Sequence, residues 1–157
     1  MKKGKIVLGI SGGVDSSVAA LLLQQKGYEV HGIFMKNWDD KTAICSAEDD
    51  YADAASVCAT LNIPLTKINY TKEYKERVFS QFLKDHELGL TPNPDVLCNK
   101  EIKFDVFEKY AKKIGAKKIA SGHYAKVLMK DDKFFIGKAK DLTKDQSYFL
   151  YQLSDKV

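Results

Sequence analysis

Apolar and polar positions along the chain follow two alternating patterns, one typical of buried strands and one typical of helices with a single apolar face. Short apolar runs such as KIVLGI predict strands, and longer stretches with apolar residues three or four positions apart predict helices. In chain order, the predicted elements are a strand at 5–10, a helix at 15–26, a strand at 29–35, a helix at 49–62, a strand at 65–70 and a helix at 72–86.

A second round of the same alternation follows a loop predicted at 87–98. The next predicted helix has one apolar face, which is formed by Phe104, Phe107, Ala111 and Ile114. The segment KKIAS at 117–121 then predicts a short strand. Strands that alternate with helices are joined by crossovers, so the pattern favours a doubly wound α/β fold of the Rossmann-like type, with a mainly parallel sheet covered on both faces.

The segment YAKVLMKDDKFFIGKA breaks this alternation near the C-terminus. Two strand-like runs flank the turn KDDK, which predicts an appended β-hairpin. The length of 157 residues suits one domain with its own core, so we expect residues 1–157 to form a single domain. The chain stops shortly after DQSYFLYQL without a terminating strand, so we also expect it to be part of a longer protein.

Composition narrows the class of protein without choosing a function. The chain is 45% hydrophobic and has a formal net charge of +4, which permits a nucleic-acid partner but does not require one. The N-terminal apolar run is too short for a signal peptide or a membrane span. The three cysteines are an odd number without a C-x-x-C pair, so we expect no disulfide scaffold, no four-ligand zinc site and a cytoplasmic location.

The segment ISGGVDSSVAA directly follows the first predicted strand and has the features of a phosphate-binding turn. Gly12 and Gly13 permit unusual backbone angles and a close approach of backbone N–H groups to an anion. The following helix adds its unpaired N–H groups and the positive end of its dipole. The turn has no P-loop lysine. The competing interpretation is that Asp15 or Ser16 merely caps the helix.

The segment LTPNPDVLCNKEIKF contains the residue pair that points to covalent chemistry. Two prolines stiffen it, and Asp95 lies three residues before Cys98. Lys100, Lys103 or a helix beginning near Asn99 would favour the Cys98 thiolate, whereas Asp95 would oppose it. A cysteine in a polar loop favours reactivity, although a small buried hydrophobe is the alternative.

The other two cysteines carry no predicted chemistry. Cys58 has the helical spacing of a core residue, and Cys45 receives no role.

Four strings in this order, GISGGVDSSVAA, TPNPDVLCNKEIKF, ASGHYAK and KDQSYFL, resemble the N-terminal catalytic domain of the tRNA-specific 2-thiouridylases. These enzymes belong to the ATP-pyrophosphatase superfamily, which splits ATP between its α and β phosphates. The resemblance covers nearly the whole chain. It implies that ATP adenylates the 2-carbonyl oxygen of the wobble uridine, after which sulfur displaces AMP. It also implies that Mg²⁺ accompanies ATP beside Asp15.

The resemblance also implies roles for individual residues. ATP contacts are implied for Gly9, Ile10, Ser11, Gly12, Gly13, Val14, Asp15, Ser16, Met35 and Gly122. Contacts to the target base are implied for Asn93, Pro94 and Asp95, and contacts to the tRNA for Lys144, Asp145 and Gln146. Asp95 is further implied to act as acid or base, and Cys98 as the catalytic nucleophile.

Structural roles compete with several of these assignments. Met35 could instead fill the core, Gly122 could only permit a turn, and Gln146 could begin a short packing helix. The sequence favours a structural histidine at position 123, and His31 and His86 receive no role.

One departure from the family concerns sulfur delivery. The family uses a second cysteine, later in the chain, that carries a persulfide and can form a disulfide with the residue matching Cys98. No cysteine follows Cys98 here. We therefore expect the chain to lack the family's persulfide cysteine and later β domains, and to depend on a sulfur donor such as a cysteine desulfurase or a relay carrier.

Two alternative functions remain open from the sequence. The first is another ATP-pyrophosphatase, similar to argininosuccinate or NAD synthetase, which would not need the cysteine. The second is a nucleotide-binding module without catalysis.

Overall fold

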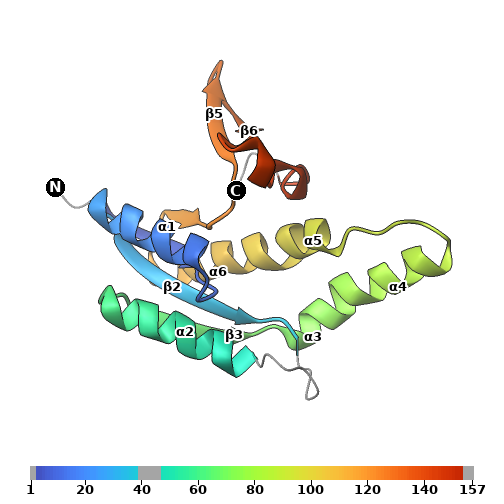
Figure 1. Ribbon diagram of the computed structural model, residues 1–157, viewed down its shortest axis with the longest axis horizontal. Helices are drawn as coiled ribbons and strands as arrows, with labels where there is room; N and C mark the ends of the chain where they lie inside the picture. Colours follow the sequence, from blue (N-terminus) through green and yellow to red (C-terminus); the bar gives the residue numbers. More distant parts are fainter. Residues whose placement is uncertain (1–2, 39–46, 154–157) are drawn as a thin grey trace.

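The computed structural model describes residues 3–38 and 47–153. Its centre is a four-stranded parallel sheet in the order β3-β2-β1-β4 (Figure 1). The strands are β1 (Lys5–Gly9), β2 (Glu29–Lys36), β3 (Leu65–Asn69) and β4 (Lys118–Ala120). In the register of the central strand, Ile6 pairs with Val30 on one side and with Lys118 on the other. The predicted parallel sheet is therefore confirmed.

Helices cover both faces of this sheet because β1 is apolar on both sides. Ile6 and Leu8 pack in one core with residues of α1 (Val14–Gln25) and α2 (Ala47–Thr60). Val7 packs in a second core with residues of α6 (Asp105–Ile114). Alternate residues of a strand point to opposite faces, so one apolar strand serves both cores. This arrangement is the predicted doubly wound fold.

A long helical excursion links β3 to the second half of the chain. It consists of α3 (Thr71–Tyr74), the π-helical segment η1 (Lys75–Phe79) and α4 (Ser80–Glu87). Together these elements span nearly the range that the sequence predicted as one helix.

The predicted loop at 87–98 is wrong at its C-terminal end, because a helix already begins at Pro94. The helix runs as α5 (Pro94–Leu97), the π-helical segment η2 (Cys98–Phe104) and α6. Asn93 caps it, since its Oδ1 accepts a hydrogen bond from the backbone N–H of Val96 at 3.3 Å. Asparagine at the cap followed by proline at the first helical position is a common helix start. Cys98 thus lies in a helix and not in a loop.

The predicted hairpin is present, with strands β5 (Lys126–Lys130) and β6 (Lys133–Gly137). It forms its own two-stranded sheet and makes no ladder with the four-stranded one. Asp131 and Asp132 at its tip both have positive φ, at 49° and 57°, as a tight two-residue turn requires. The short 3₁₀ helices η3 (Leu142–Lys144) and η4 (Ser147–Phe149) follow.

Within the described residues, no helix combines the length and apolar character needed to cross a membrane.

Candidate functional site

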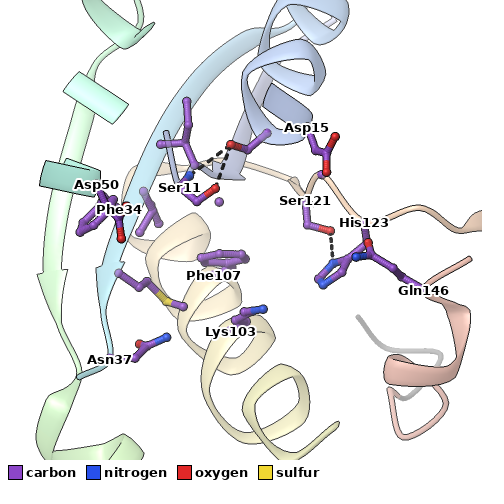
Figure 2. A pocket seen from close by; sticks show the side chains of 16 residues that line it. Ser11, Asp15, Phe34, Asn37, Asp50, Lys103, Phe107, Ser121, His123 and Gln146 are labelled. Carbon is purple, nitrogen blue, oxygen red and sulfur yellow. Dashed lines mark hydrogen bonds between the residues drawn. The ribbon is translucent and has the colours of Figure 1, made fainter. Parts of the chain in front are cut away.

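A cavity of about 340 Å³ lies where the glycine turn, β2, α6 and the segment after β4 meet (Figure 2). Because β1, β2 and β4 are parallel, their carboxyl ends share one edge, which is where open α/β sheets bind ligands. The lining residues are Gly9, Ile10, Ser11, Asp15, Ser16, Ile33, Phe34, Met35, Asn37, Asp50, Lys103, Phe107, Ser121, Gly122, His123 and Gln146.

Five of the eight turn residues that the sequence assigned to ATP line this cavity, and three do not. Val14 is 76% exposed and lines a second hollow between α1 and the hairpin. Gly12 has φ +83°, and a Cβ there would meet the backbone of Ala54 at 2.9 Å, so this glycine packs the turn against α2. Gly13 has φ −70° and ψ 162°, which any residue adopts. The expectation of unusual angles is therefore correct for Gly12 and wrong for Gly13.

The N-terminus of α1 has no side-chain cap. Gly13 occupies the N-cap position without a capping hydrogen bond, which overturns the alternative that Asp15 or Ser16 merely caps this helix. The hydroxyl of Ser16 instead donates to the Gly13 carbonyl at 3.1 Å, and that of Ser17 does so at 2.8 Å. The backbone N–H of Ser11 donates to Ser16 Oγ at 3.2 Å. The serines thus shape the turn, while the first N–H groups of the helix stay available to an anion.

Two further glycines allow close packing around the cavity. A Cβ on Gly122 would lie 2.9 Å from the backbone nitrogen of Ser16, so the segment after β4 approaches the start of α1 only because residue 122 is glycine. A Cβ on Gly9 would collide with the ring of Phe107. Close packing against Ser16 therefore explains the glycine at position 122 better than the turn into His123 that the sequence suggested.

Asp15 is bound by two side chains from the far end of the chain. The Tyr124 hydroxyl donates to its Oδ1 at 2.9 Å, and Lys144 Nζ lies 3.2 Å from its Oδ2. The hydrogen bond from Tyr124, followed by that from Lys144, lowers the pKa of Asp15. These cationic and hydroxyl partners keep the carboxylate ionised beside the helix N-terminus.

The residues assigned to tRNA contact also stabilise the C-terminal segment. Asp145 Oδ1 accepts from the backbone N–H of Ala139 at 2.7 Å. Gln146 exchanges two hydrogen bonds with Tyr124: its Oε1 accepts from the Tyr124 N–H at 3.0 Å, and its own N–H donates to the Tyr124 carbonyl at 2.8 Å. Gln146 reaches the cavity, directly before the short packing helix that the alternative interpretation expected.

On the β2 side, Met35 lines the cavity and also packs against the second core, so the adenine-contact role and the core role are compatible. Asn37 lies two residues further on. Its Oδ1 is buried without a hydrogen-bond partner among the described residues. A buried acceptor without a partner is costly, and a ligand amine or hydroxyl would satisfy it.

The sequence did not place Lys103 in the nucleotide site. Figure 2 shows Lys103 and Phe107 projecting from one helix toward the space between Ser11 and His123.

The sequence favoured a structural role for His123, yet this residue lines the same cavity. Its Nδ1 lies 2.8 Å from Ser121 Oγ, and its ring stacks on Phe104. Burial, followed by the charge of Lys103, lowers the pKa of His123 to about 4, so the imidazole is neutral at pH 7. Lys103 lies in KEIKF and His123 in SGHY, two segments that are distant along the chain. Nothing in the residue spacing of either segment predicts that they line the same cavity.

Neither Cys98 nor Asp95 lines the cavity. Asp95 is exposed, whereas Cys98 is 6% exposed and packs in the second core with Val78 and Ile102. Burial raises the pKa of Cys98; the charge of Lys103 lowers it, and that of Asp95 raises it further. The expectation of an accessible, thiolate-favouring loop cysteine is therefore wrong for this structure.

Tyr74 was also missed by the sequence analysis. Tyr74 packs against the second core, and its pKa is raised by burial first and then by the charges of Cys98 and Asp95.

Cys58 is 2% exposed in the first core, as predicted, and both it and Cys98 are free thiols. Cys45 lies outside the described residues. Within residues 3–38 and 47–153, no group of three or more His, Cys, Asp or Glu side chains is arranged to hold a metal ion.

The sequence model of the family described as tRNA methyl transferase HUP domain matches residues 4–157. The chain belongs to this family. Its HUP domain is the doubly wound unit whose glycine turn, β2 and α6 surround the cavity.

Named relatives share the sequence of this HUP domain over nearly all its length. It is 56% identical over 158 residues to the tRNA-specific 2-thiouridylase MnmA of Nitrosomonas europaea, covering 99% of the chain and 44% of that relative. It is 54% identical over 155 residues to MnmA of Buchnera aphidicola, covering 97% of the chain and 42% of the relative. The resemblance drawn from the four motifs is confirmed, and the chain spans less than half the length of these relatives.

Among solved structures, the HUP domain is similar to the U34-tRNA thiolase NcsA from Methanococcus maripaludis with its [4Fe-4S] cluster. The TM-score is 0.55 at 21% sequence identity, over 78% of this chain and 38% of that one. At this identity, the similarity concerns the fold.

Proposed function

We propose that this chain is the ATP-dependent activating domain of a tRNA-uridine 2-sulfurtransferase. The observation that carries the proposal is the uncapped N-terminus of α1, which leaves backbone N–H groups at a cavity of nucleotide size. ATP would lie with its phosphates at Ser11 to Ser16 and its base toward Met35 and the unpartnered Asn37 Oδ1. The identity to proteins named tRNA-specific 2-thiouridylase supports tRNA as the second substrate.

In the proposed reaction, the 2-carbonyl oxygen of a tRNA uridine attacks the α-phosphorus of ATP, and pyrophosphate leaves. The helix dipole and the N–H groups of the turn stabilise the negative charge on the departing group. Mg²⁺, bound mainly by the phosphates, would supply further neutralising charge, and Asp15, one of the carboxylates that line the cavity, would share it. Adenylation turns a poor leaving oxygen into a good one, so that a sulfur nucleophile then displaces AMP.

Asn93, Pro94 and Asp95 would meet the extruded uridine. Asn93 and Asp95 are exposed around the start of α5, so they are accessible to a flipped base. The net charge of +4 favours approach of an RNA backbone. In this proposal a sulfur-donor protein supplies the sulfur, and the reaction takes place in the cytoplasm.

The burial of Cys98 favours a second candidate function, nucleotide binding without thiol chemistry. A thiol that is 6% exposed and has a raised pKa is a poor nucleophile. Under the main proposal, the segment around Tyr74 and Leu97, which packs against the same core, must open when tRNA binds. Under the second, Cys98 is a core residue.

The test is pyrophosphate release from ATP by the purified chain in the presence of a tRNA transcript with uridine at the wobble position. We expect release with this tRNA and none with the matched transcript carrying cytidine there. Asp95→Asn should reduce release at least tenfold, whereas Cys58→Ala, a core change at a residue that does not itself line the cavity, should reduce it only as far as it lowers the folded fraction.

Other outcomes identify the alternatives. ATP binding without any pyrophosphate release would support the nucleotide-binding module. Release that ignores the wobble base would support another ATP-pyrophosphatase.

A further inference from the structure

The cavity is lined by two carboxylates and one lysine among the described residues. Asp15 and Asp50 line it, and Lys103 is the sole lysine or arginine among the described residues that do so. His123 adds no charge, because its pKa of about 4 keeps the imidazole neutral at pH 7. Lys144 is paired with Asp15 and does not line the cavity. A polyphosphate in this cavity therefore has Lys103 as its available cationic side chain.

Lys103 and Cys98 lie on the same helical segment. The two residues are five positions apart within the π-helical segment η2, Cys98–Phe104. In an α-helix such residues would point about 140° apart. In a π-helix each N–H bonds to the carbonyl five residues earlier, so residues five apart follow one another on one side. The local π geometry thus places Lys103, which lines the cavity, nearer around the helix axis to Cys98, which lies in the second core, than an α-helix would.

The charge of the Lys103 ammonium group acts on both Cys98 and His123. Its charge lowers the pKa of Cys98 against the larger effect of burial, and it also lowers that of His123. No ion pair engages Lys103 within residues 3–38 and 47–153. By contrast, Lys100 on the same helix is exposed and lies 3.4 Å from Glu101.

We propose that Lys103 is the phosphate-binding cation that the glycine turn lacks, and that the same ammonium group favours the thiolate of Cys98, so that nucleotide phosphate and thiolate compete for it. A bound nucleotide then keeps Cys98 as a thiol, and departure of the phosphates returns the charge to the sulfur. This coupling delays thiolate formation until the nucleotide has reacted. It rests on the proposed function in requiring that the cavity accept ATP.

The first test measures Kd by calorimetry for ATP and for adenosine with the wild type, Lys103→Met, Lys103→Arg and the matched surface control Lys100→Met. A charge-assisted hydrogen bond of about 1.5–3 kcal/mol corresponds to a loss of roughly 10- to 100-fold in ATP affinity for Lys103→Met. Adenosine affinity should stay unchanged, which separates a phosphate contact from a folding defect. Lys103→Arg should retain most of the affinity, and Lys100→Met all of it.

The second test follows alkylation of Cys98 by iodoacetamide across pH, with mass spectrometry to separate it from the other cysteines. ATP should shift the midpoint of the wild-type profile to higher pH. Lys103→Met should show the higher midpoint without ATP and no further shift with it. A nucleotide that merely blocks access would lower the plateau and leave the midpoint in place.

Three outcomes overturn the inference. They are unchanged ATP affinity in Lys103→Met, equal losses for ATP and adenosine, and a midpoint that ATP does not move. If the wild type itself binds no ATP, the proposed function fails as well, whereas wild-type binding that survives in Lys103→Met contradicts the inference alone.

Discussion

Lys144 Nζ lies 3.2 Å from Oδ2 of Asp15, although the two residues are 129 positions apart in the sequence. This ion pair, with the Tyr124 hydroxyl on the same carboxylate, fastens the segment after the hairpin to the first turn of α1. Residues that follow β4 are therefore attached to the glycine turn through Asp15. Lys144 serves this attachment and does not line the cavity, where Lys103 is the lysine among the described residues.

We expect Tyr124→Phe to raise the pKa of Asp15, because the hydroxyl is the largest cause of its lowering. Lys144→Met should raise it by a smaller amount, because its hydrogen bond is the second cause. NMR titration of the Asp15 carboxyl carbon measures both changes. Lys140→Met removes a neighbouring positive charge that is not among these causes and serves as the control. An unchanged Asp15 pKa in both test variants would show that the contacts do not persist in solution.

Gly122→Ala should lower the free energy of unfolding by about 1–3 kcal/mol, the usual cost of forcing an extra methyl group into a close contact. The added Cβ would lie 2.9 Å from the backbone nitrogen of Ser16, and backbone cannot yield as a flexible side chain does. Gly13→Ala is the matched control, because its Cβ would meet Ser11 Oγ at 3.6 Å at an ordinary φ. Urea unfolding of both variants gives the comparison, and equal losses would refute the packing argument.

Stability should fall as the pH drops from about 6.5 toward 4, because His123 has a pKa of about 4 when folded and the ordinary value of 6.5 when unfolded. Above pH 6.5 both states are neutral and the residue contributes nothing to this dependence. Below it the unfolded state takes up the proton first, at a cost of up to about 3 kcal/mol, reduced by partial solvent screening.

Urea unfolding at pH 7 and pH 4.5 measures this effect, with His123→Asn as the comparison. The variant should lose part of the difference between the two pH values. The pKa of His31 is also lowered by burial, so the variant should keep some pH dependence of its stability in the same direction. An identical pH dependence in the variant and the wild type would mean that His123 is accessible to protons in the folded state.

The sequence predicted the order of strands and helices well because apolar periodicity is a local property. The run in β1 and residues 33–35 of β2 are apolar, as expected of strands covered on both faces. The helix beginning at Pro94 was missed, although its signal was present. Asn93 followed by proline was interpreted as a stiff loop, whereas the same pair is also a helix cap with proline at the first position.

The environment of Cys98 was not predictable from its neighbours along the chain. Half of the other residues in LTPNPDVLCNKEIKF are polar or charged and the apolar ones show no clear periodicity, so the sequence suggested a polar loop. The residues that bury it, among them Val7 and Val78, come from a strand and from a helix of the preceding excursion. Burial depends on which distant segments pack on a residue, and no local pattern records this.

By itself, the sequence determined the doubly wound fold, the position of the glycine turn at a strand end, and membership of the family through four motifs. Only the tertiary structure decided which side chains meet at that turn. It brought Lys103, His123 and Gln146 to the cavity, tied Asp15 to Lys144, and enclosed Cys98 in the second core. The reason is physical: periodicity is set by the backbone over one or two turns, whereas a site is set by packing between segments that meet only when the whole chain has folded.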